Sequence, residues 1–174
     1  MPRAPRKLDT EEELYAAAMR ALMRRSYSIH QMLEYLERRA ADAAVVRSVI
    51  ERLKQRQYLD DARYARDFAR SHAQLRRQGR FRITRELRSR GVPDRFIEAA
   101  LRDAFAETNE AELLRIRLKR RLARMTGEID SRKLASLYRN LMAAGFSADL
   151  IRSELRAIAE QPMPDLPETF EDEA

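Results

Sequence analysis

Two adjacent carboxylates, Asp60 and Asp61, stand in the segment QYLDDARYARDF, and such a pair could serve acid–base catalysis, a metal ion or a helix start. Carboxylates of an acid–base pair normally face each other across a cleft from separate elements, whereas neighbours in sequence point in different directions. With Asp60 as N-cap, Leu59 and Tyr64 have the spacing of a hydrophobic staple. Asp61 then lies in the first turn, where the helix dipole favours an anion. The segment therefore predicts a helix start rather than an active site.

The small number of cysteine and histidine residues excludes most metal sites and most catalytic sites. The sequence has no cysteine and two histidines, His30 and His72, so a histidine zinc site would lack ligands. We expect both histidines at the surface or near helix caps, and we expect no enzyme activity, no metal and no cofactor. No apolar run has the length of a membrane span and no signal peptide follows the N-terminus, so a cytoplasmic protein is expected.

The charge distribution indicates a polyanionic partner. The net charge is +7 and the pI is about 10.1. Six acids and no base follow from Glu160 onward, which leaves the preceding body at +13. Arginine greatly outnumbers lysine, and its planar guanidinium grips phosphates and carboxylates with two hydrogen bonds, which fits anion recognition. A genome rich in G and C, whose codons favour arginine over lysine, explains the excess of arginine equally well.

One pattern occurs three times in a chain that is rich in Ala, Leu, Arg and Glu, a composition typical of all-α proteins. The copies are anchored on Leu36, Leu87 and Leu141, which are 51 and 54 residues apart. An apolar residue lies four before each anchor, a small residue four after it, a branched apolar residue ten after it and an aliphatic residue fourteen after it. These positions are Met32, Ile83 and Leu137; Ala40, Gly91 and Gly145; Val46, Ile97 and Ile151; and Ile50, Leu101 and Leu155.

The pattern predicts a helix, a tight turn and a second helix in each copy. Gly91 and Gly145 suit the left-handed position that follows a helix, and Asp42, Pro93 and Ser147 suit the start of the next one. A longer helix precedes each pair. The chain is therefore predicted to be all-α, with three tandem three-helix repeats of helix-turn-helix type that stack into an elongated, straight or curved array.

The predicted segments are a disordered N-terminus (1–8), three-helix repeats at 9–59, 60–106 and 107–159, and an acidic disordered tail (160–174). The predicted core faces of the longer helices are Leu14, Ala18, Ala21 and Leu22; Tyr64, Phe68 and Leu75; and Leu114, Leu118, Leu122 and Met125. Core positions are also expected for Met19, Met23, Met32 and Met142.

Three segments carry a family resemblance. They are YSIHQML at 27–33, YLDDARYARDF at 58–68 and QGRFRITRELRSRGV at 78–92. Together they resemble the RecX family of bacterial regulatory proteins, which modulate the recombinase RecA. The match covers the first two repeats and reaches the third through the repeat pattern. Ala40 departs from the family, which has glycine at that helix end, so the geometry of the first turn is in question.

The resemblance implies a fold of tandem three-helix repeats and a regulator without catalytic residues. Members of the RecX family resemble one another in binding the RecA–DNA filament along its groove. They suppress RecA's ATP hydrolysis, strand exchange and coprotease activity, and so modulate recombination and the SOS response. The implied partners are RecA in its nucleoprotein filament and DNA, with no membrane partner, and the expected state is a monomer.

Two basic clusters are the expected contacts with the filament or its nucleic acid. The first cluster is Arg76, Arg77, Arg80, Arg82, Arg85 and Arg88, and the second is Arg117, Arg120, Arg121 and Arg124. Phe81, within the first cluster, is available to stack or to pack. The arginines of the second cluster lie within roughly a 100° arc of a helical wheel, beside an apolar stripe. The alternative is that both clusters are solvated helix faces with Glu–Arg pairs.

Two further alternatives stay open. The segment RELRSRGVPDRFIEAAL at 85–101 looks like the helix-turn-helix of a transcription factor, although such factors usually carry one such unit per chain and dimerise on paired half-sites. Three tandem copies fit a groove-spanning clamp better. The acidic tail is either a plain solvating segment or a mimic of nucleic acid that folds back on the basic body.

Overall fold

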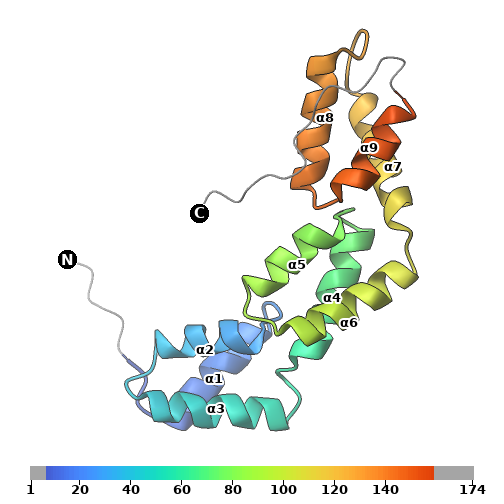
Figure 1. Ribbon diagram of the computed structural model, residues 1–174. Coiled ribbons are helices and arrows are strands. Elements are labelled where there is room, and N and C mark those ends of the chain that lie inside the picture. Colours follow the sequence, from blue (N-terminus) through green and yellow to red (C-terminus); the bar gives the residue numbers. More distant parts are fainter. Residues whose placement is uncertain (1–6, 159–174) are drawn as a thin grey trace, which may run out of the picture. The chain divides into compact units, whose positions relative to one another are not determined.

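The computed structural model describes residues 7–158, which form nine α-helices (Figure 1). Within this range there is no sheet, and a single parallel bridge joins Leu8 to Ala40. The all-α prediction is confirmed. Most of the predicted disordered N-terminus (1–6 of 1–8) and the acidic tail (160–174) lie outside the described residues. The helices are α1 (Glu11–Leu22), α2 (Ile29–Glu37), α3 (Ala43–Gln55), α4 (Asp61–Gln74), α5 (Arg80–Arg88), α6 (Asp94–Ala106), α7 (Glu110–Leu122), α8 (Ser131–Ala143) and α9 (Ala148–Arg156).

The described residues belong to two compact units. The first unit holds 7–67 and 87–100, and the second holds 68–86 and 101–158. Helices α4, α5 and α6 each contribute residues to both units, so the division runs through the second predicted repeat. The repeat boundaries at 9–59, 60–106 and 107–159 stay predictions.

The core consists of the apolar positions that recur in the sequence. Helices α1, α2 and α3 pack on one another in the first unit, and α7, α8 and α9 do so in the second (Figure 1). Full burial of one such side chain stabilises the fold by about 1.5–3 kcal/mol, so the repeat pattern accounts for much of the core. The buried positions are Met32, Ile83 and Leu137; Leu36, Leu87 and Leu141; Val46, Ile97 and Ile151; and Ile50, Leu101 and Leu155.

The helix starts at Asp42 and Ser147 follow the prediction, because both are N-caps whose side chains accept backbone N–H groups of the first turn. Ser28 is the N-cap of α2 in the same way. At α4, Asp60 accepts the N–H of Arg63 at 3.0 Å. Each such cap contributes about 1 kcal/mol. The first carboxylate of the pair is therefore a helix cap, as predicted.

The turns between paired helices end in two different ways. Gly91 and Gly145 have φ of +70° and +90°, so the predicted left-handed turns are confirmed. Ala40 has no positive φ, since a Cβ atom disfavours that region. The backbone of Leu8 instead pairs with the residues on either side of Ala40, at 2.7 and 3.0 Å. The N-terminal segment thus supplies the hydrogen bonds at the turn that lacks glycine.

The predicted core face of α4 is wrong in part. Leu75 is 76% exposed just beyond the helix end, and Tyr64 and Phe68 are half-buried. The fully buried residues of α4 are Ala65, Ala69 and Ala73.

One single-residue prediction is also wrong, since Met23 is 84% exposed because it follows the last turn of α1. His72 lies in the last turn of α4, near the helix cap as one of its two predicted places. Its side chain is buried, with Nδ1 2.6 Å from Oε1 of Gln78 and the ring stacked on Phe68. The half-exposed side chain of His30 agrees with the prediction.

A four-residue contact, the first joint, holds the start of α2 within the first unit. The Ser28 hydroxyl donates to the carbonyl of Arg90 at 2.6 Å, and the Ile29 N–H donates to Oδ1 of Asp61 at 2.9 Å. The second carboxylate of the pair therefore satisfies a donor of another helix. A first-turn acid caps the middle helix of the preceding repeat.

The second unit contains a corresponding contact, the second joint, whose donor residues lie 51 positions after Ser28 and Ile29. The Gly79 N–H donates to the carbonyl of Ala144 at 2.9 Å, and the Arg80 N–H donates to Oε1 of Glu110 at 2.9 Å. Glu110 is the first residue of α7, as Asp61 is of α4. Both joints thus use a turn carbonyl and the first acid of the following helix.

Replacing Asp61 separates the hydrogen bond of the first joint from its charge. Asp61→Ala leaves the Ile29 N–H without its acceptor and is expected to cost about 1–3 kcal/mol of unfolding free energy. Asp61→Asn keeps an oxygen acceptor and is expected to cost less than about half of that. Urea unfolding of both variants measures the difference, and equal losses would contradict the role of the hydrogen bond.

The same carboxyl group gives a pH dependence. Burial raises the pKa of Asp61, although the hydrogen bond from Ile29 lowers it in part. The folded chain therefore holds this proton more tightly than the unfolded chain, so the group's contribution to stability is full below the unfolded pKa and is lost as the pH rises through the folded pKa. The difference in stability between wild type and Asp61→Asn is expected to show that fall above about pH 4.

Candidate nucleic-acid interface

Six of the ten predicted arginines surround one hollow in the second unit. Arg76 and Arg77 come from the turn after α4, and the other four come from α7 and the residues just after it, with Asn140 of α8 completing the lining. The hollow has a volume of about 260 Å³. The structure thus places Arg76 and Arg77 of the first predicted cluster beside all four arginines of the second predicted cluster. We call this set the arginine hollow: Arg76, Arg77, Arg117, Arg120, Arg121 and Arg124.

The amphipathic pattern of α7 places its basic side chains at the hollow. Leu114 and Leu118 are buried in the second unit, as predicted, and Leu122 and Met125 are half-buried. Because residues three and four apart share a helix face, the arginines project beside this apolar stripe. Packing of the leucines therefore fixes the direction of the charged face.

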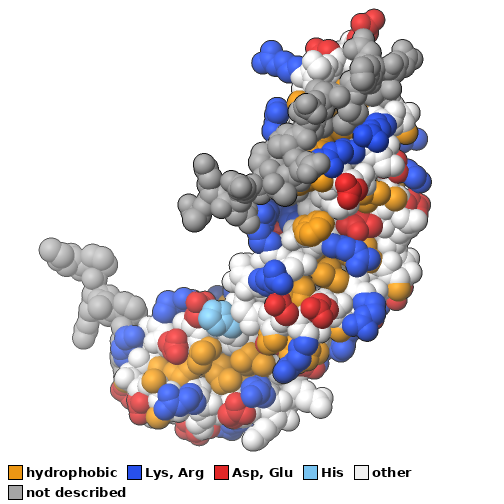
Figure 2. All heavy atoms as spheres, viewed as in Figure 1, with side chains coloured by type: hydrophobic (Ala, Val, Ile, Leu, Met, Phe, Trp, Pro, Cys, Tyr) orange, Lys and Arg blue, Asp and Glu red, His pale blue; other side chains and the backbone are white. Residues whose placement is uncertain are grey.

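The arginine hollow lacks the carboxylates that accompany arginine elsewhere. Figure 2 shows acidic and basic side chains interspersed over the visible face, so net charge alone does not mark a site. Arg52, Arg70 and Arg115 each lie within 4 Å of a carboxylate. Within residues 7–158, none of the six hollow arginines does, and no Asp or Glu lines the hollow. Their charges are therefore available to an anion.

Arg117 is the least solvated member of the hollow. Its side chain is half-buried, and one Nη donates to the carbonyl of Arg76 at 3.4 Å. Its buried Nε has no hydrogen-bond partner among the described residues. Burial, together with the charges of Arg82 and Arg121, lowers the pKa of Arg117. A bound phosphate would satisfy the free donor and offset this repulsion.

Arg77 occupies a strained backbone position at the rim of the hollow. Its φ is +50°, a left-handed conformation that costs a non-glycine residue about 1–2 kcal/mol. The turn lets the chain leave α4 toward the Gln78–Gly79 segment, and the Gln78 N–H bonds to the carbonyl of His72 at 3.1 Å. Glycine would adopt this conformation without that cost.

Arg77→Gly is expected to raise stability and weaken anion binding together. Removal of the strain adds about 1 kcal/mol of unfolding free energy. Loss of one cation lowers the salt slope for a single-stranded oligonucleotide by about 0.7. Urea unfolding and fluorescence anisotropy at several salt concentrations measure both.

Gln57 offers a matched control, because it has φ of +59° and lies outside the hollow. Gln57→Gly is expected to gain similar stability and to leave oligonucleotide binding unchanged. An Arg77→Gly variant that binds like wild type would remove Arg77 from the interface.

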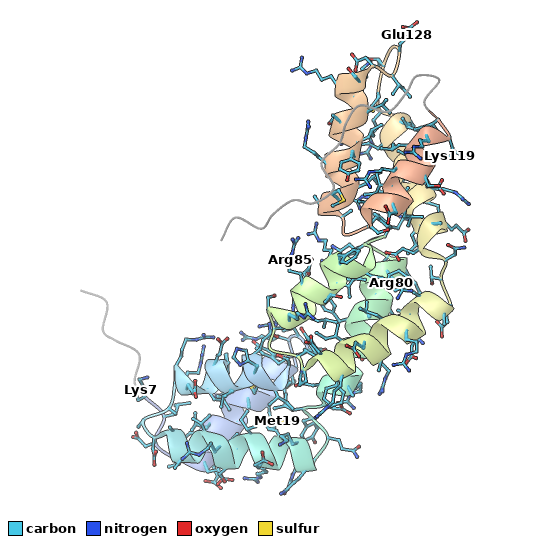
Figure 3. The ribbon with its side chains drawn as sticks, viewed as in Figure 1. Lys7, Met19, Arg80, Arg85, Lys119 and Glu128 are labelled. Atoms are coloured by element: carbon cyan, nitrogen blue, oxygen red, sulfur yellow. The ribbon has the colours of Figure 1, made fainter. Side chains whose placement is uncertain are left out.

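The other four predicted arginines lie outside the arginine hollow. Arg80 pairs with Glu110 at 3.0 Å, and Arg88 in the first unit pairs with Asp94 at 2.8 Å. Arg85 is exposed and points outward from α5 (Figure 3), and it forms no hydrogen bond or ion pair within residues 7–158.

Arg82 has a structural role at the turn between α8 and α9. It pairs with Glu86 at 2.9 Å and donates to the carbonyl of Ala143 at 3.1 Å. The alternative of helical Glu–Arg pairing therefore describes Arg82, whereas Arg80 and Arg88 pair with acids of other helices.

Other kinds of site are not found in the described residues. Between residues 7 and 158, no group of three or more His, Asp or Glu side chains lies close enough to hold a metal ion. The same part of the chain contains no helix with the length and apolar character of a membrane span.

The chain is similar to known proteins over most of its length. The family model described as the second three-helix domain of RecX matches residues 60–101. A protein of Trichlorobacter lovleyi named regulatory protein RecX is 35% identical over 144 residues, which cover 80% of this chain and 92% of that protein. The chain belongs to the RecX family. A RecX of Halorhodospira halophila is also 35% identical, over 86% of this chain and 90% of that protein.

Solved RecX structures share the fold. The RecX crystal structure from Lactobacillus salivarius superposes with a TM-score of 0.73 at 19% identity, covering 85% of this chain and 96% of that one. A second regulatory protein RecX gives 0.71 at 21% identity, over 84% and 73%. The RecX resemblance predicted from the sequence is thus confirmed, and the chain is a regulatory protein of that family.

Proposed function

We propose that this RecX protein binds RecA–DNA filaments along their groove and inhibits RecA's ATP hydrolysis, strand exchange and coprotease activity. It thereby modulates recombination and the SOS response in the cytoplasm, as a monomer and without catalysis of its own. The proposal rests on family membership and on the arginine hollow, in which six unpaired guanidinium groups surround one concave surface. Filament-bound DNA supplies the phosphates that such a surface would attract.

The ten predicted arginines contribute unequally in this proposal. The arginine hollow makes the principal phosphate contact, and exposed Arg85 adds a further one. Arg80, Arg82 and Arg88 already have carboxylate partners and contribute less, because an engaged guanidinium must leave its partner before it grips a phosphate.

The deciding experiment is the rate of ATP hydrolysis by RecA on single-stranded DNA with substoichiometric amounts of this protein. We expect the rate to fall, because one molecule along the groove restrains several RecA protomers. An unchanged rate at every ratio would contradict the proposed function. A parallel titration of bare single-stranded DNA shows whether binding requires RecA.

A helix-turn-helix transcription factor is the alternative function. Its turn glycines are engaged in packing, since a side chain at Gly91 would meet the ring of His30, and one at Gly145 would meet the backbone of Arg82. These contacts favour helix pairs that build the array over pairs that read base edges. A sequence-specific dimeric footprint on bare DNA would favour the transcription factor instead.

A further inference from the structure

A second hollow lies in the first unit and is lined in part by the segment QYLDDARYARDF. It has a volume of about 220 Å³ and is formed by the end of α1, the turn before α4 and the first two turns of α4. Three tyrosines, Tyr27, Tyr58 and Tyr64, line it together with Asp60 and Asp67. We call it the tyrosine hollow. Its carboxylates distinguish it from the arginine hollow, where none occur.

Helix geometry brings the polar groups of this hollow together. Asp60, Tyr64 and Asp67 follow one another at four and three residues, so they share a face of α4. Asp67 is exposed and has no ion pair in the described part of the chain. Arg63 also lines the hollow, but its guanidinium donates to the carbonyl of Gln57 at 2.7 Å. Asp67 is therefore left without a cation inside a protein of net charge +7.

Three tyrosine rings of the first unit have an arginine stacked on them. The guanidinium of Arg25 lies 3.7 Å from the ring centre of Tyr27, and that of Arg39 lies 3.7 Å from the ring centre of Tyr35. Arg52 stacks in the same way on Tyr15, at 4.3 Å. Arginine on tyrosine is thus a repeated contact of this unit, and each such contact stabilises a cation over the negative face of the ring.

Tyr58 differs from these three tyrosines. It is 45% exposed, and no guanidinium lies over its ring in the described structure. It follows Gln57, whose backbone is left-handed, with φ of +59°. The same kind of strained residue, Arg77, borders the arginine hollow. Strain of this type tends to occur at binding sites.

We propose that the tyrosine hollow binds an arginine side chain of a partner protein. The guanidinium stacks on the exposed ring of Tyr58 and forms a two-pronged hydrogen bond with the carboxylate of Asp67, with Asp60 adding negative charge. Arginine is favoured over lysine because its planar guanidinium group can stack on a ring and donate two parallel hydrogen bonds to a carboxylate. Nucleic acid is disfavoured because two carboxylates repel its phosphates. This site goes beyond the proposed phosphate contact, since it recognises protein by the opposite charge.

A peptide titration of the whole chain tests this site without RecA. Capped tri-arginine is added to the isotope-labelled protein at low salt, and amide shifts are followed by NMR, with capped tri-citrulline as the neutral probe of the same shape. We expect shifts centred on residues 57–68 with tri-arginine and none with tri-citrulline. Because the chain is net positive, general electrostatics oppose binding of the tri-arginine peptide, so a local response reports the hollow.

Variants identify the groups that bind. Asp67→Asn and Tyr58→Ala are each expected to weaken tri-arginine binding about threefold, and together about tenfold. Tyr58→Phe keeps the ring face and is expected to bind like wild type. Asp103→Asn removes an exposed aspartate of α6 in the second unit and serves as the matched control.

Three results would overturn the proposal: equal shifts with tri-citrulline, wild-type affinity in the double variant, or tighter binding of a short oligonucleotide at the same amides. The outcome is independent of RecA inhibition. A chain that fails to inhibit RecA but binds tri-arginine at this hollow would refute the proposed function alone.

Discussion

Gly79→Ala is expected to lower the free energy of unfolding by about 3–5 kcal/mol. A Cβ atom at residue 79 would fall on the carbonyl of Gly145 and lie 2.6 Å from the nitrogen of Phe146. Both obstacles are backbone, so the α8–α9 turn must move away. The movement breaks the hydrogen bonds from Gly79 to Ala144 and from Phe81 to Gly145. Overpacking costs about 1–3 kcal/mol and each lost bond about 1 kcal/mol.

Urea unfolding measures this loss, with Gly127→Ala as the matched control. Gly127 has φ of +74°, but a Cβ atom there meets only Nζ of Lys133, at 3.6 Å. The control therefore reports backbone conformation alone and is expected to cost about 1 kcal/mol. If Gly79→Ala cost no more than Gly127→Ala, the tight approach at the second joint would be contradicted. Gly79 also follows Arg76 and Arg77 closely, so the variant is expected to weaken the arginine hollow.

The double substitution Arg120→Glu with Arg124→Glu is expected to weaken binding of a short single-stranded oligonucleotide about thirtyfold. Both residues are exposed and line the arginine hollow from one face, so the fold is expected to survive. Loss of two charged contacts of about 1 kcal/mol each gives this factor. The salt slope is expected to fall by about 1.4, because two phosphate contacts are lost. Anisotropy titrations at several salt concentrations measure both quantities.

A control of equal charge change separates the arginine hollow from net charge. Lys119→Glu with Arg102→Glu alters exposed residues of the same compact unit that do not line the hollow. We expect this control to weaken binding only about twofold, because exposed charges at a distance are screened by salt. Equal losses in the two double variants would show that binding follows total charge, and that the hollow is not a distinct site.

The sequence predicted those parts of the fold that depend on local spacing. Leu36, Leu87 and Leu141 recur with their apolar neighbours at helical intervals, and such periodicity determines which face is buried. Gly91 and Gly145 mark turns through their own backbone freedom. Caps such as Asp60 were also predictable, because donor and acceptor lie within one turn.

Contacts between distant segments were not predictable in the same way. Asp61 was expected to stabilise the first turn of its own helix. Its hydrogen bond from the Ile29 N–H instead depends on how α2 packs against α4. His72 was expected at the surface or near a helix cap, and it does lie in the last turn of α4. Its contacts with Gln78 and Phe68 inside the second unit were not predicted.

The candidate site shows the same limit. The ten arginines were identified by charge, yet the sequence divided them by chain position. The structure regroups Arg76 and Arg77 with α7 and gives Arg82 a carbonyl and a carboxylate as partners. Local spacing indicates the pair of Arg82, because Glu86 follows it by four residues in the same helix. It does not indicate the pair of Arg80, because Glu110 is 30 residues away.

The matching joints have a consequence for how such a protein changes size in evolution. The middle repeat supplies an acid, Asp61, to α2 of the repeat before it and takes one, Glu110, from α7 of the repeat after it. A tandem duplication of that segment in the gene would therefore give a longer chain in which every joint finds its complement. Its deletion would leave Glu110 as the acid available to Ile29. We therefore expect that the number of repeats can change by whole units without loss of these hydrogen bonds.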